Sequence, residues 1–92
     1  MIYKDKEDKV HELKILHEYF NDIYFESKTF EIRKDDRGFK CGDVLRLREL
    51  SENIGKSCED MYTGRELFVS VNYIERSDDY CKQGYCVLGL ET

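Results

Sequence analysis

Two side chains of opposite charge, Glu31 and Arg33, stand two residues apart in the alternating segment 29–33. Side chains two residues apart on a β-strand project to the same side of it, and Thr29 joins them there. A carboxylate beside a guanidinium presents hydrogen-bond acceptors and a fork of donors to one planar ligand, which is what reading the edge of a nucleobase requires. The plainer interpretation of the same spacing is a surface ion pair.

Lys28 and His11 are further candidates for this site. Lys28 points away from Glu31 if the strand already includes it, and it reaches the site only if the preceding turn redirects it. His11 shares a strand face with Leu13 and Ile15, a setting in which a histidine is more often a buried structural residue than a catalytic or ligand-binding one. We keep both residues as candidates for contact with a ligand.

Two tyrosines could stack on a base, because every nucleobase has a π face. Aromatic residues of small barrels mostly pack in the core, and Tyr73 continues the apolar face of its segment, so we expect it to be buried. Tyr62 is the better candidate for stacking. Asp43 follows Gly42 in a tight turn, and we expect its carboxylate to bond neighbouring amides rather than a ligand.

The charge of the chain is uneven. Its 92 residues hold 15 Lys and Arg against 20 Asp and Glu, a net charge of −5. Segment 28–48 holds seven cations and four anions and so carries +3, which leaves −8 for the rest. An acidic protein is a poor general binder of duplex nucleic acid, because phosphate binding depends on cation density. A local basic band suits a small anionic ligand or a nucleotide, although solvated surface cations explain it equally well.

The sequence predicts no metal site, no cofactor and no disulfide. No two cysteines form a CxxC pair, and both histidines precede every cysteine, so the close ligand spacing of a zinc site is absent. No cysteine has a neighbouring base that would make it a nucleophile. The residues concerned are Cys41, Cys58, Cys81, Cys86, His11 and His17.

Length and hydropathy indicate one small soluble domain. No apolar run approaches the roughly 20 residues that cross a bilayer, and the first residues lack the apolar centre of an export signal. We therefore expect a cytoplasmic protein without membrane contact, and by default a monomer. Residues 1–9 are mostly charged and are expected to be frayed, which leaves 10–92 as the single domain.

Hydrophobic periodicity predicts more strand than helix. The expected order is strand 11–15, helix 18–25, strand 29–33, strand 44–49, a long loop 51–64, strand 65–76 and a closing strand 85–90. Short connections favour antiparallel neighbours, so we expect an α+β, mostly β protein. Its architecture would be a small, mainly antiparallel β-barrel of about five strands with one flanking helix.

Several segments together resemble one known family. SKTFEIR at 27–33, followed by GDVL at 42–45, is similar to the signature of the ASCH superfamily, whose domains have the PUA-like fold, a β-barrel module frequent in RNA-modifying enzymes. HELKI at 11–15, YTGRE at 62–66 and GYCVLG at 84–89 are similar to an uncharacterised bacterial and phage subgroup of it. The likeness covers nearly the whole chain.

The resemblance implies a cleft between helix and barrel, lined by segment 28–33 and facing a nucleobase or a nucleotide. Some relatives hydrolyse the amide of an N4-acetylated cytidine with a lysine, a threonine in the strand after it, and a glutamate from a later strand. Lys28 matches the lysine, whereas Glu31 stands where those relatives have threonine. Glu66 and Glu75 are the candidates for the later glutamate.

Three functions fit these observations. The first is an RNA- or modified-nucleotide-binding module that prefers single strands, in which Lys28 and Arg33 contact phosphate or base acceptors and Glu31 accepts from an exocyclic amine. The second is a small amidohydrolase for an N-acylated nucleoside such as N4-acetylcytidine, with Lys28 activating the nucleophile and Glu31 as general base. The third is a protein-interaction domain that uses the acidic remainder of the surface. Whether the protein is an enzyme stays open at this point.

Overall fold

The computed structural model describes residues 9–51 and 61–92, and these residues form five strands and one helix. The elements are β1 (Val10–Ile15), α1 (His17–Tyr24), β2 (Phe30–Lys34), β3 (Val44–Leu50), β4 (Tyr62–Glu75) and β5 (Tyr85–Glu91). The expected α+β, mostly β class is confirmed. Of the segment expected to be frayed, 1–8 lies outside the described residues, as do positions 52–60 of the expected long loop.

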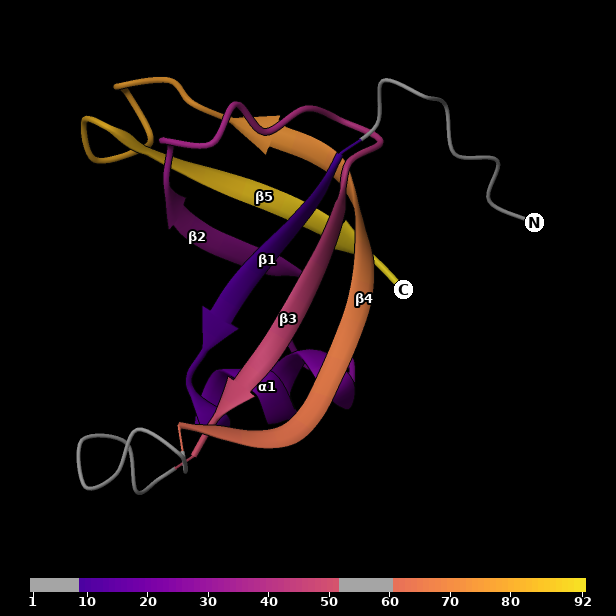
Figure 1. Ribbon diagram of the computed structural model, residues 1–92. Coiled ribbons are helices and arrows are strands. Elements are labelled where there is room, and N and C mark those ends of the chain that lie inside the picture. The colour runs from indigo at the N-terminus through magenta and orange to yellow at the C-terminus, as the bar shows by residue number, and fades with distance from the viewer. Residues whose placement is uncertain (1–8, 52–60) are drawn as a thin grey trace.

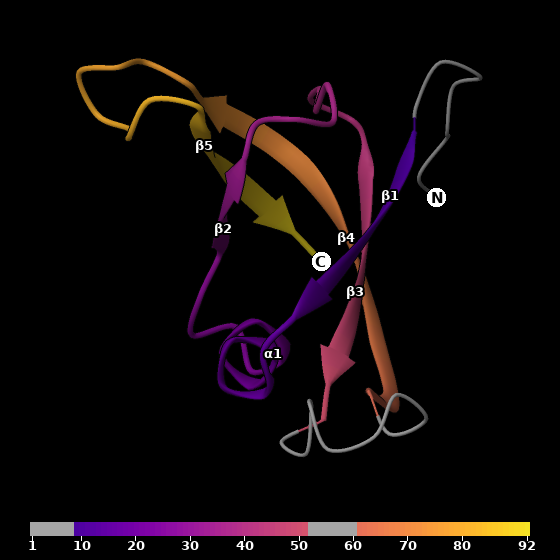
Figure 2. The same cartoon turned by 60° about the vertical axis from the view of Figure 1, so that its left-hand side comes forward.

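The strands form one sheet in the order β1-β3-β4-β5-β2. The pairs β3–β4, β4–β5 and β5–β2 are antiparallel, and β1 joins β3 in parallel. The sheet curls into a half-barrel, with β1 and β3 facing β2 and β5 across it and α1 lying at one end (Figure 1, Figure 2). The mainly antiparallel sheet with one flanking helix is thus confirmed. The barrel is open because β1 and β2 are the two edges of the sheet.

Alternating burial builds the core of the half-barrel. In β1 the side chains of His11, Leu13 and Ile15 face inward, as their spacing predicts. The neighbouring β3 contributes Leu45 and Leu47 to the same core. This pattern fixes the register of the strands, because a slip by one residue would turn the apolar face outward.

Strand β4 differs from the expectation at its start and in its second half. It begins at Tyr62, so residues 62–64 belong to the strand and not to the loop before it. Its pairing with β5 shifts between Val71 and Tyr73, where a β-bulge interrupts the ladder. After the bulge, the two faces of the strand exchange places relative to the core. Tyr73 is 61% exposed, and Ile74 packs against the core in its place. The expected burial of Tyr73 is therefore wrong.

Helix α1 covers one end of the half-barrel. Phe20 and Ile23 lie on one side of the helix and are almost completely buried in the core. After the last helical turn, Glu26 adopts a left-handed backbone conformation with a φ of 61°. The amide of Lys28 then donates to the carbonyl of Asp22 at 2.9 Å. This turn directs the side chain of Lys28 back toward α1.

Arginine side chains bridge the opening between the edge strands β1 and β2, which we call the seam. Arg33 of β2 donates through Nη2 to the carbonyl of Lys14 at 2.5 Å. Arg37, which follows β2, donates through Nη1 to the carbonyl of Glu12 at 3.1 Å. Unpaired strand edges invite pairing with other chains, and these contacts cover two carbonyl groups of the β1 edge.

Candidate functional site

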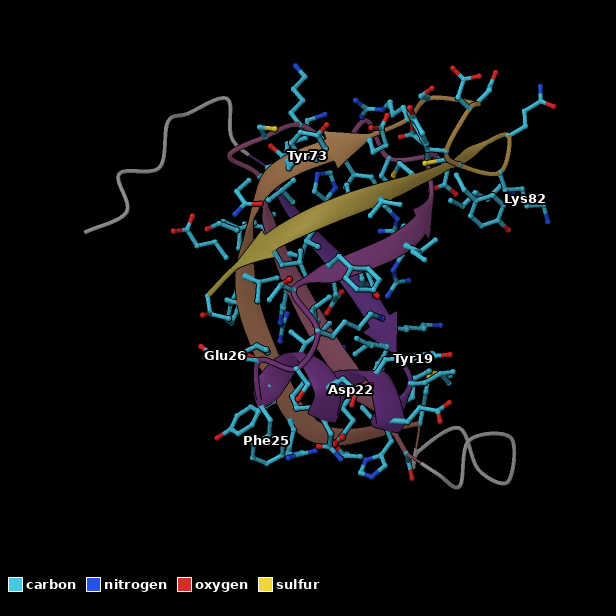
Figure 3. The ribbon with its side chains drawn as sticks, turned by 180° about the vertical axis from the view of Figure 1, so that it is seen from behind. Tyr19, Asp22, Phe25, Glu26, Tyr73 and Lys82 are labelled. Carbon is cyan, nitrogen blue, oxygen red and sulfur yellow. The ribbon has the colours of Figure 1, made fainter. Side chains whose placement is uncertain are left out.

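A cleft of about 740 Å³ lies at the end of the seam that meets α1. Its walls are residues 14–16 at the end of β1, Tyr19 and Asp22 of α1, Ser27 and Lys28 of the turn, and residues 30–33 of β2. Figure 3 shows Tyr19 and Asp22 along α1, which lies below the sheet in that view. A cleft between helix and barrel is therefore present, and segment 28–33, except for Thr29, forms one of its walls.

Strand β2 turns its polar side inward at the cleft. Glu31 is only 4% exposed, whereas its apolar neighbours Phe30 and Ile32 are 42% and 58% exposed. Strands of small proteins usually bury their apolar side, so core packing does not explain this orientation. A buried carboxylate is stable only when charged or hydrogen-bonding partners replace the water that it has lost.

Two cations hold the carboxylate of Glu31. Lys28 Nζ lies 3.2 Å from Oε1, and Arg33 lies 3.1 Å from Oε2 through Nε and 2.9 Å through Nη2. Lys28 therefore reaches the site, because the turn after α1 redirects it. The Nη2 group of Arg33 also donates to the carbonyl of Lys14, so one guanidinium serves both the carboxylate and the seam.

Aromatic rings flank the ammonium group of Lys28. Its Nζ lies 4.4 Å from the centre of the Tyr19 ring and 5.3 Å from that of the Phe30 ring. These cation–π contacts hold the ammonium group over apolar surface. Sequence reasoning did not select Tyr19 or Phe30 for the site. The sequence did contain a signal for them, because Tyr19 and Phe30 lie in the expected helix and strand on either side of Lys28.

The cleft carries a small positive charge. Its lining contains the cations Lys14, Lys28 and Arg33 and the anions Asp22 and Glu31, a net of +1. Its volume falls within the roughly 300–1,000 Å³ of typical small-molecule sites, which also combine apolar walls with a few convergent polar groups. The arrangement can therefore hold a flat, neutral or anionic molecule.

Three of the expected ligand-binding residues lie elsewhere. Thr29 is exposed and lines a smaller hollow near the end of β5; it precedes the first strand residue, so the alternation that would align it with Glu31 does not reach it. His11 is buried in the half-barrel. Tyr62 lies at the start of β4, with the guanidinium of Arg48 3.7 Å from its ring centre. The members of the expected set that the cleft does bring together are Lys28, Glu31 and Arg33.

His11 and Asp43 form a buried structural pair. His11 Nε2 lies 2.8 Å from Asp43 Oδ2, and the rings of His11 and Phe39 meet edge to face. The Asp43 carboxylate also accepts from the amides of Lys40 and Lys9, at 3.0 and 3.3 Å. Burial alone raises the pKa of Asp43, but the bonds from His11 and the two amides outweigh it and lower the pKa below its ordinary value. The pair ties the start of β1 to the turn before β3.

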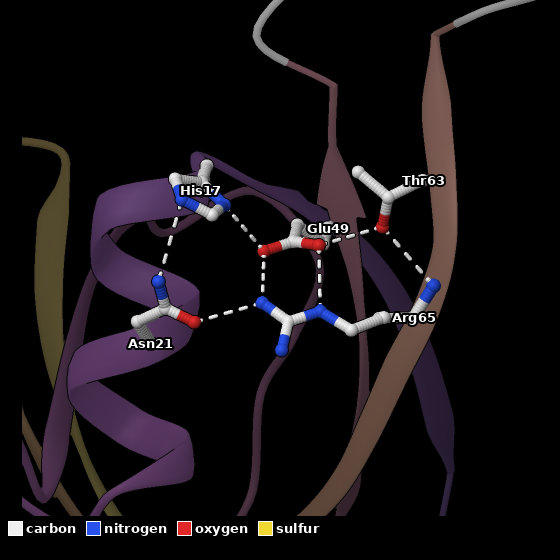
Figure 4. A network of polar contacts seen from close by, with 5 residues as sticks. All are labelled: His17, Asn21, Glu49, Thr63 and Arg65. Atoms are coloured by element: carbon white, nitrogen blue, oxygen red, sulfur yellow. Dashed lines mark hydrogen bonds and ion pairs between the residues drawn. The ribbon is translucent and has the colours of Figure 1, made fainter.

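A second polar network lies on another side of α1 and joins the helix to β3 and β4 (Figure 4). The buried Glu49 accepts from Arg65 Nε at 2.9 Å and from Thr63 Oγ1 at 2.6 Å. His17 Nδ1 lies 2.8 Å from the same carboxylate, and Asn21 accepts from Arg65 at 2.7 Å. The bonds from Arg65, and then those from Thr63 and His17, outweigh burial and lower the pKa of Glu49 to about 2. Sequence reasoning missed this network, because residues so far apart in the chain share no local pattern.

The basic band at 28–48 is divided between two faces of the sheet. Arg33 lies in the cleft, whereas Arg46 lies on the outer face of β3. There Arg46 pairs with Glu12 at 3.2 Å and with Glu66 at 2.7 Å. Exposed pairs of this kind add little to stability. The band is therefore not one continuous phosphate-binding surface.

Neither candidate for the later glutamate of the hydrolase pattern lines the cleft. Glu66 is exposed and belongs to the outer-face ion pairs. Glu75, at the end of β4, accepts from the amide of Ser77 at 3.1 Å. The lysine of that pattern is thus present in the cleft without either glutamate.

Metal-ligand chemistry finds no support in the part of the chain that the structure describes. Within it, no three His, Cys, Asp or Glu side chains are grouped closely enough to hold a metal ion. Cys86 is completely buried, and this burial raises the pKa of its thiol, which makes the thiol unreactive. Cys58 lies outside the described residues.

The fold and the cleft define a small, mostly β domain with a ligand-sized polar site between its helix and its edge strands. Over residues 10–90 the chain matches the family described as a domain of unknown function, DUF3850, and it belongs to that family. A search of curated proteins found no match. Among the described residues, no helix combines the length and the apolar character needed to cross a bilayer.

Proposed function

We propose that this protein is a PUA-like module that binds RNA or a modified nucleotide, with one base held in the cleft beside segment 28–33. The observation that carries the proposal is the inward-facing Glu31, held between Lys28 and Arg33 at the centre of a cleft of about 740 Å³. A buried charged cluster that opens into a ligand-sized cleft is a feature of binding sites rather than of a packed core.

The walls of the cleft suit a flat ring. Tyr19 and Phe30 flank the polar centre, and aromatic faces stack on any nucleobase. A base must leave its helix to enter such a cleft, so single strands, loops and free nucleotides fit better than duplexes. The net charge of −5 and the ion pairing of Arg46 on the outer face also disfavour a long duplex.

The test is an NMR titration of the labelled protein with short single-stranded RNAs and with modified nucleosides. We expect the amide resonances of segment 28–33 to move for at least one ligand. Arg33→Lys keeps the charge but loses the planar fork of donors, so affinity should fall by about tenfold.

Arg46→Lys is the matched control, because it makes the same change on the outer face of β3, and affinity should stay within about twofold. Resonances of segment 28–33 that stay unmoved for every ligand would refute the proposal. An equal loss of affinity in both arginine variants would place the binding surface outside the cleft.

One observation favours a second function, hydrolysis of an N-acylated nucleoside. Lys28 Nζ and Glu31 Oε1 lie 3.2 Å apart in the cleft, within reach for a proton transfer. Against it, each oxygen of this carboxylate already accepts from a cation, so neither is free to take a proton from a substrate. The discriminating assay is incubation with N4-acetylcytidine and chromatography for cytidine. Turnover that disappears in Lys28→Ala would establish the enzyme, and no turnover would leave the binding module.

A further inference from the structure

We propose that the cleft selects a flat heterocycle with two neighbouring hydrogen-bond acceptors on one edge, the pattern of guanine at O6 and N7 or of cytosine at O2 and N3. This inference rests on the proposed function, because it names the class of base that the same cleft takes. Its basis is the division of the polar groups of the cleft into those that are engaged and those that remain for a ligand.

The acceptors of Glu31 are engaged. Lys28 approaches Oε1, and two nitrogens of Arg33 approach Oε2, while the side chain of Glu31 is only 6% exposed. An exocyclic amine could bond this carboxylate only by displacing a charged partner in a poorly solvated site. We therefore assign Glu31 to holding the two cations, in place of the direct contact with an exocyclic amine expected from the sequence.

Donors remain at the centre of the cleft. An ammonium group carries three N–H bonds and a guanidinium five. Lys28 directs one of its bonds to Glu31. Arg33 uses Nε and Nη2 for Glu31 and for the carbonyl of Lys14, and its Nη1 has no hydrogen-bond partner among the described residues. Lys28 therefore keeps two N–H bonds, which suit a pair of adjacent acceptors, and Nη1 of Arg33 adds a further donor to the lining of the same cleft.

The charge of the cleft points the same way. With three cations and two anions in the lining, an electron-rich edge is favoured and a cationic base is disfavoured. The rings of Tyr19 and Phe30 shield the ammonium group of Lys28 from water, which strengthens its bond to an acceptor.

These requirements divide the four common bases into two pairs. Guanine presents O6 and N7 side by side, and arginine or lysine on these two atoms is the commonest specific contact to a base. Cytosine presents O2 next to N3. Adenine places the N6 amine beside N7, and uracil places an N–H between its two carbonyls, so each of them sets a donor against the donors of the cleft.

The experiment titrates the labelled protein with GMP, CMP, AMP and UMP, which carry the same phosphate and differ only in the base. We expect GMP or CMP to bind at least about tenfold more tightly than AMP and UMP, since one good bidentate contact discriminates at that level. The purine control is 7-deaza-GMP, which lacks the N7 acceptor. If guanine is the preferred base, this analogue should bind about tenfold more weakly than GMP. If cytosine is preferred, GMP and its deaza analogue should bind equally weakly.

AMP or UMP binding as tightly as the better of GMP and CMP would overturn the inference and leave the proposed function standing. If none of the four nucleotides moves the resonances of segment 28–33, and the RNAs and modified nucleosides also fail, the proposed function falls as well. Glu31→Gln supplies a second measurement, because its amide can both donate and accept. The preference for GMP or CMP should narrow at least about fivefold in this variant, and an unchanged preference would contradict the role assigned to Glu31.

Discussion

Glu31 and Glu49 are carboxylates that the half-barrel buries beside α1, and an arginine holds each of them. Glu49 of β3 is bonded by Arg65 and Thr63 of β4 and by His17 of α1, so the network joins three elements, which is the geometry of a structural tie. The Glu49 partners also line a hollow, but it is wide open at the surface. Around Glu31 the partners face the more enclosed cleft and keep unused donors. The same pairing chemistry thus stabilises the fold at one site and prepares a binding surface at the other.

Glu49 should make the stability of the protein depend on pH. Its pKa falls from an ordinary value of 4.5 in the unfolded chain to about 2 in the folded protein. Because the folded-state pKa is the lower one, its contribution is full above the unfolded-state pKa and is lost as the pH falls from 4.5 to about 2. The loss should be at most about 3 kcal/mol of unfolding free energy. Urea unfolding at a series of pH values measures it.

Two variants isolate this effect. Glu49→Gln removes the titrating group, so the difference in unfolding free energy between the wild type and this variant should shrink toward acid pH. Glu91→Gln, at an exposed position of β5, should run parallel to the wild type. If the unfolding free energy of Glu49→Gln also runs parallel to that of the wild type across the pH series, the bonds from Arg65 and its neighbours do not favour the charged carboxylate over its hydrated state in the unfolded chain.

At the scale of elements, segment 28–33 shows what local patterns can predict. The two-residue alternation correctly puts Glu31 and Arg33 on one side, because strand geometry is a property of neighbouring residues. It does not tell which side is buried, and that depends on β5 and α1 packing against the strand. The alternation also fails at Val71, where a bulge dictated by pairing with β5 moves Tyr73 to the surface.

The turn between α1 and β2 offers a test at this scale. Glu26 holds a φ of 61°, a conformation that costs a side-chain-bearing L-residue roughly 1–2 kcal/mol and costs glycine little. Glu26→Gly should therefore raise the unfolding free energy by about 0.5–1 kcal/mol, after the extra entropy of glycine in the unfolded chain is counted. Chemical denaturation measures the change.

Glu26→Ala is the control for that substitution. It removes the same side chain, including the 3.4 Å contact with Thr92, but it keeps the Cβ atom that makes the conformation costly. This variant should be no more stable than the wild type. If both variants gain stability equally, the gain comes from the lost carboxylate and not from relief of the backbone.

For the whole molecule, the class could be predicted, and so could the five strands and one helix of the described residues, because each element has its own hydrophobic period. The pairing of β1 with β3 in parallel could not, since periodicity does not identify partners and α1 and β2 intervene in the chain. The Glu49 network shares this origin, because Glu49 and Arg65 meet only once β3 and β4 have paired.

The seam gives a prediction for the whole molecule. Arg37 donates to the Glu12 carbonyl across it, and removing this bond frees the middle of an edge strand. In Arg37→Ala the amides of β1 should exchange with solvent a few-fold faster than in the wild type, while those of β4 should not change. Hydrogen exchange followed by NMR measures both sets. Lys34→Ala, at the exposed end of β2, should leave β1 unchanged. Equal acceleration in both variants would mean that any loss at β2 loosens the edge.

Arg33 connects the cleft to the seam, because its guanidinium bonds both Glu31 and the carbonyl of Lys14. A molecule that binds the remaining donor of this guanidinium, Nη1, holds the group in the orientation in which Nη2 bonds the main-chain oxygen. Occupancy of the cleft and closure of the half-barrel are then linked equilibria, and each must shift the other by the same free energy. A tighter seam would raise the affinity for the ligand, and a saturating ligand would make β1 harder to detach.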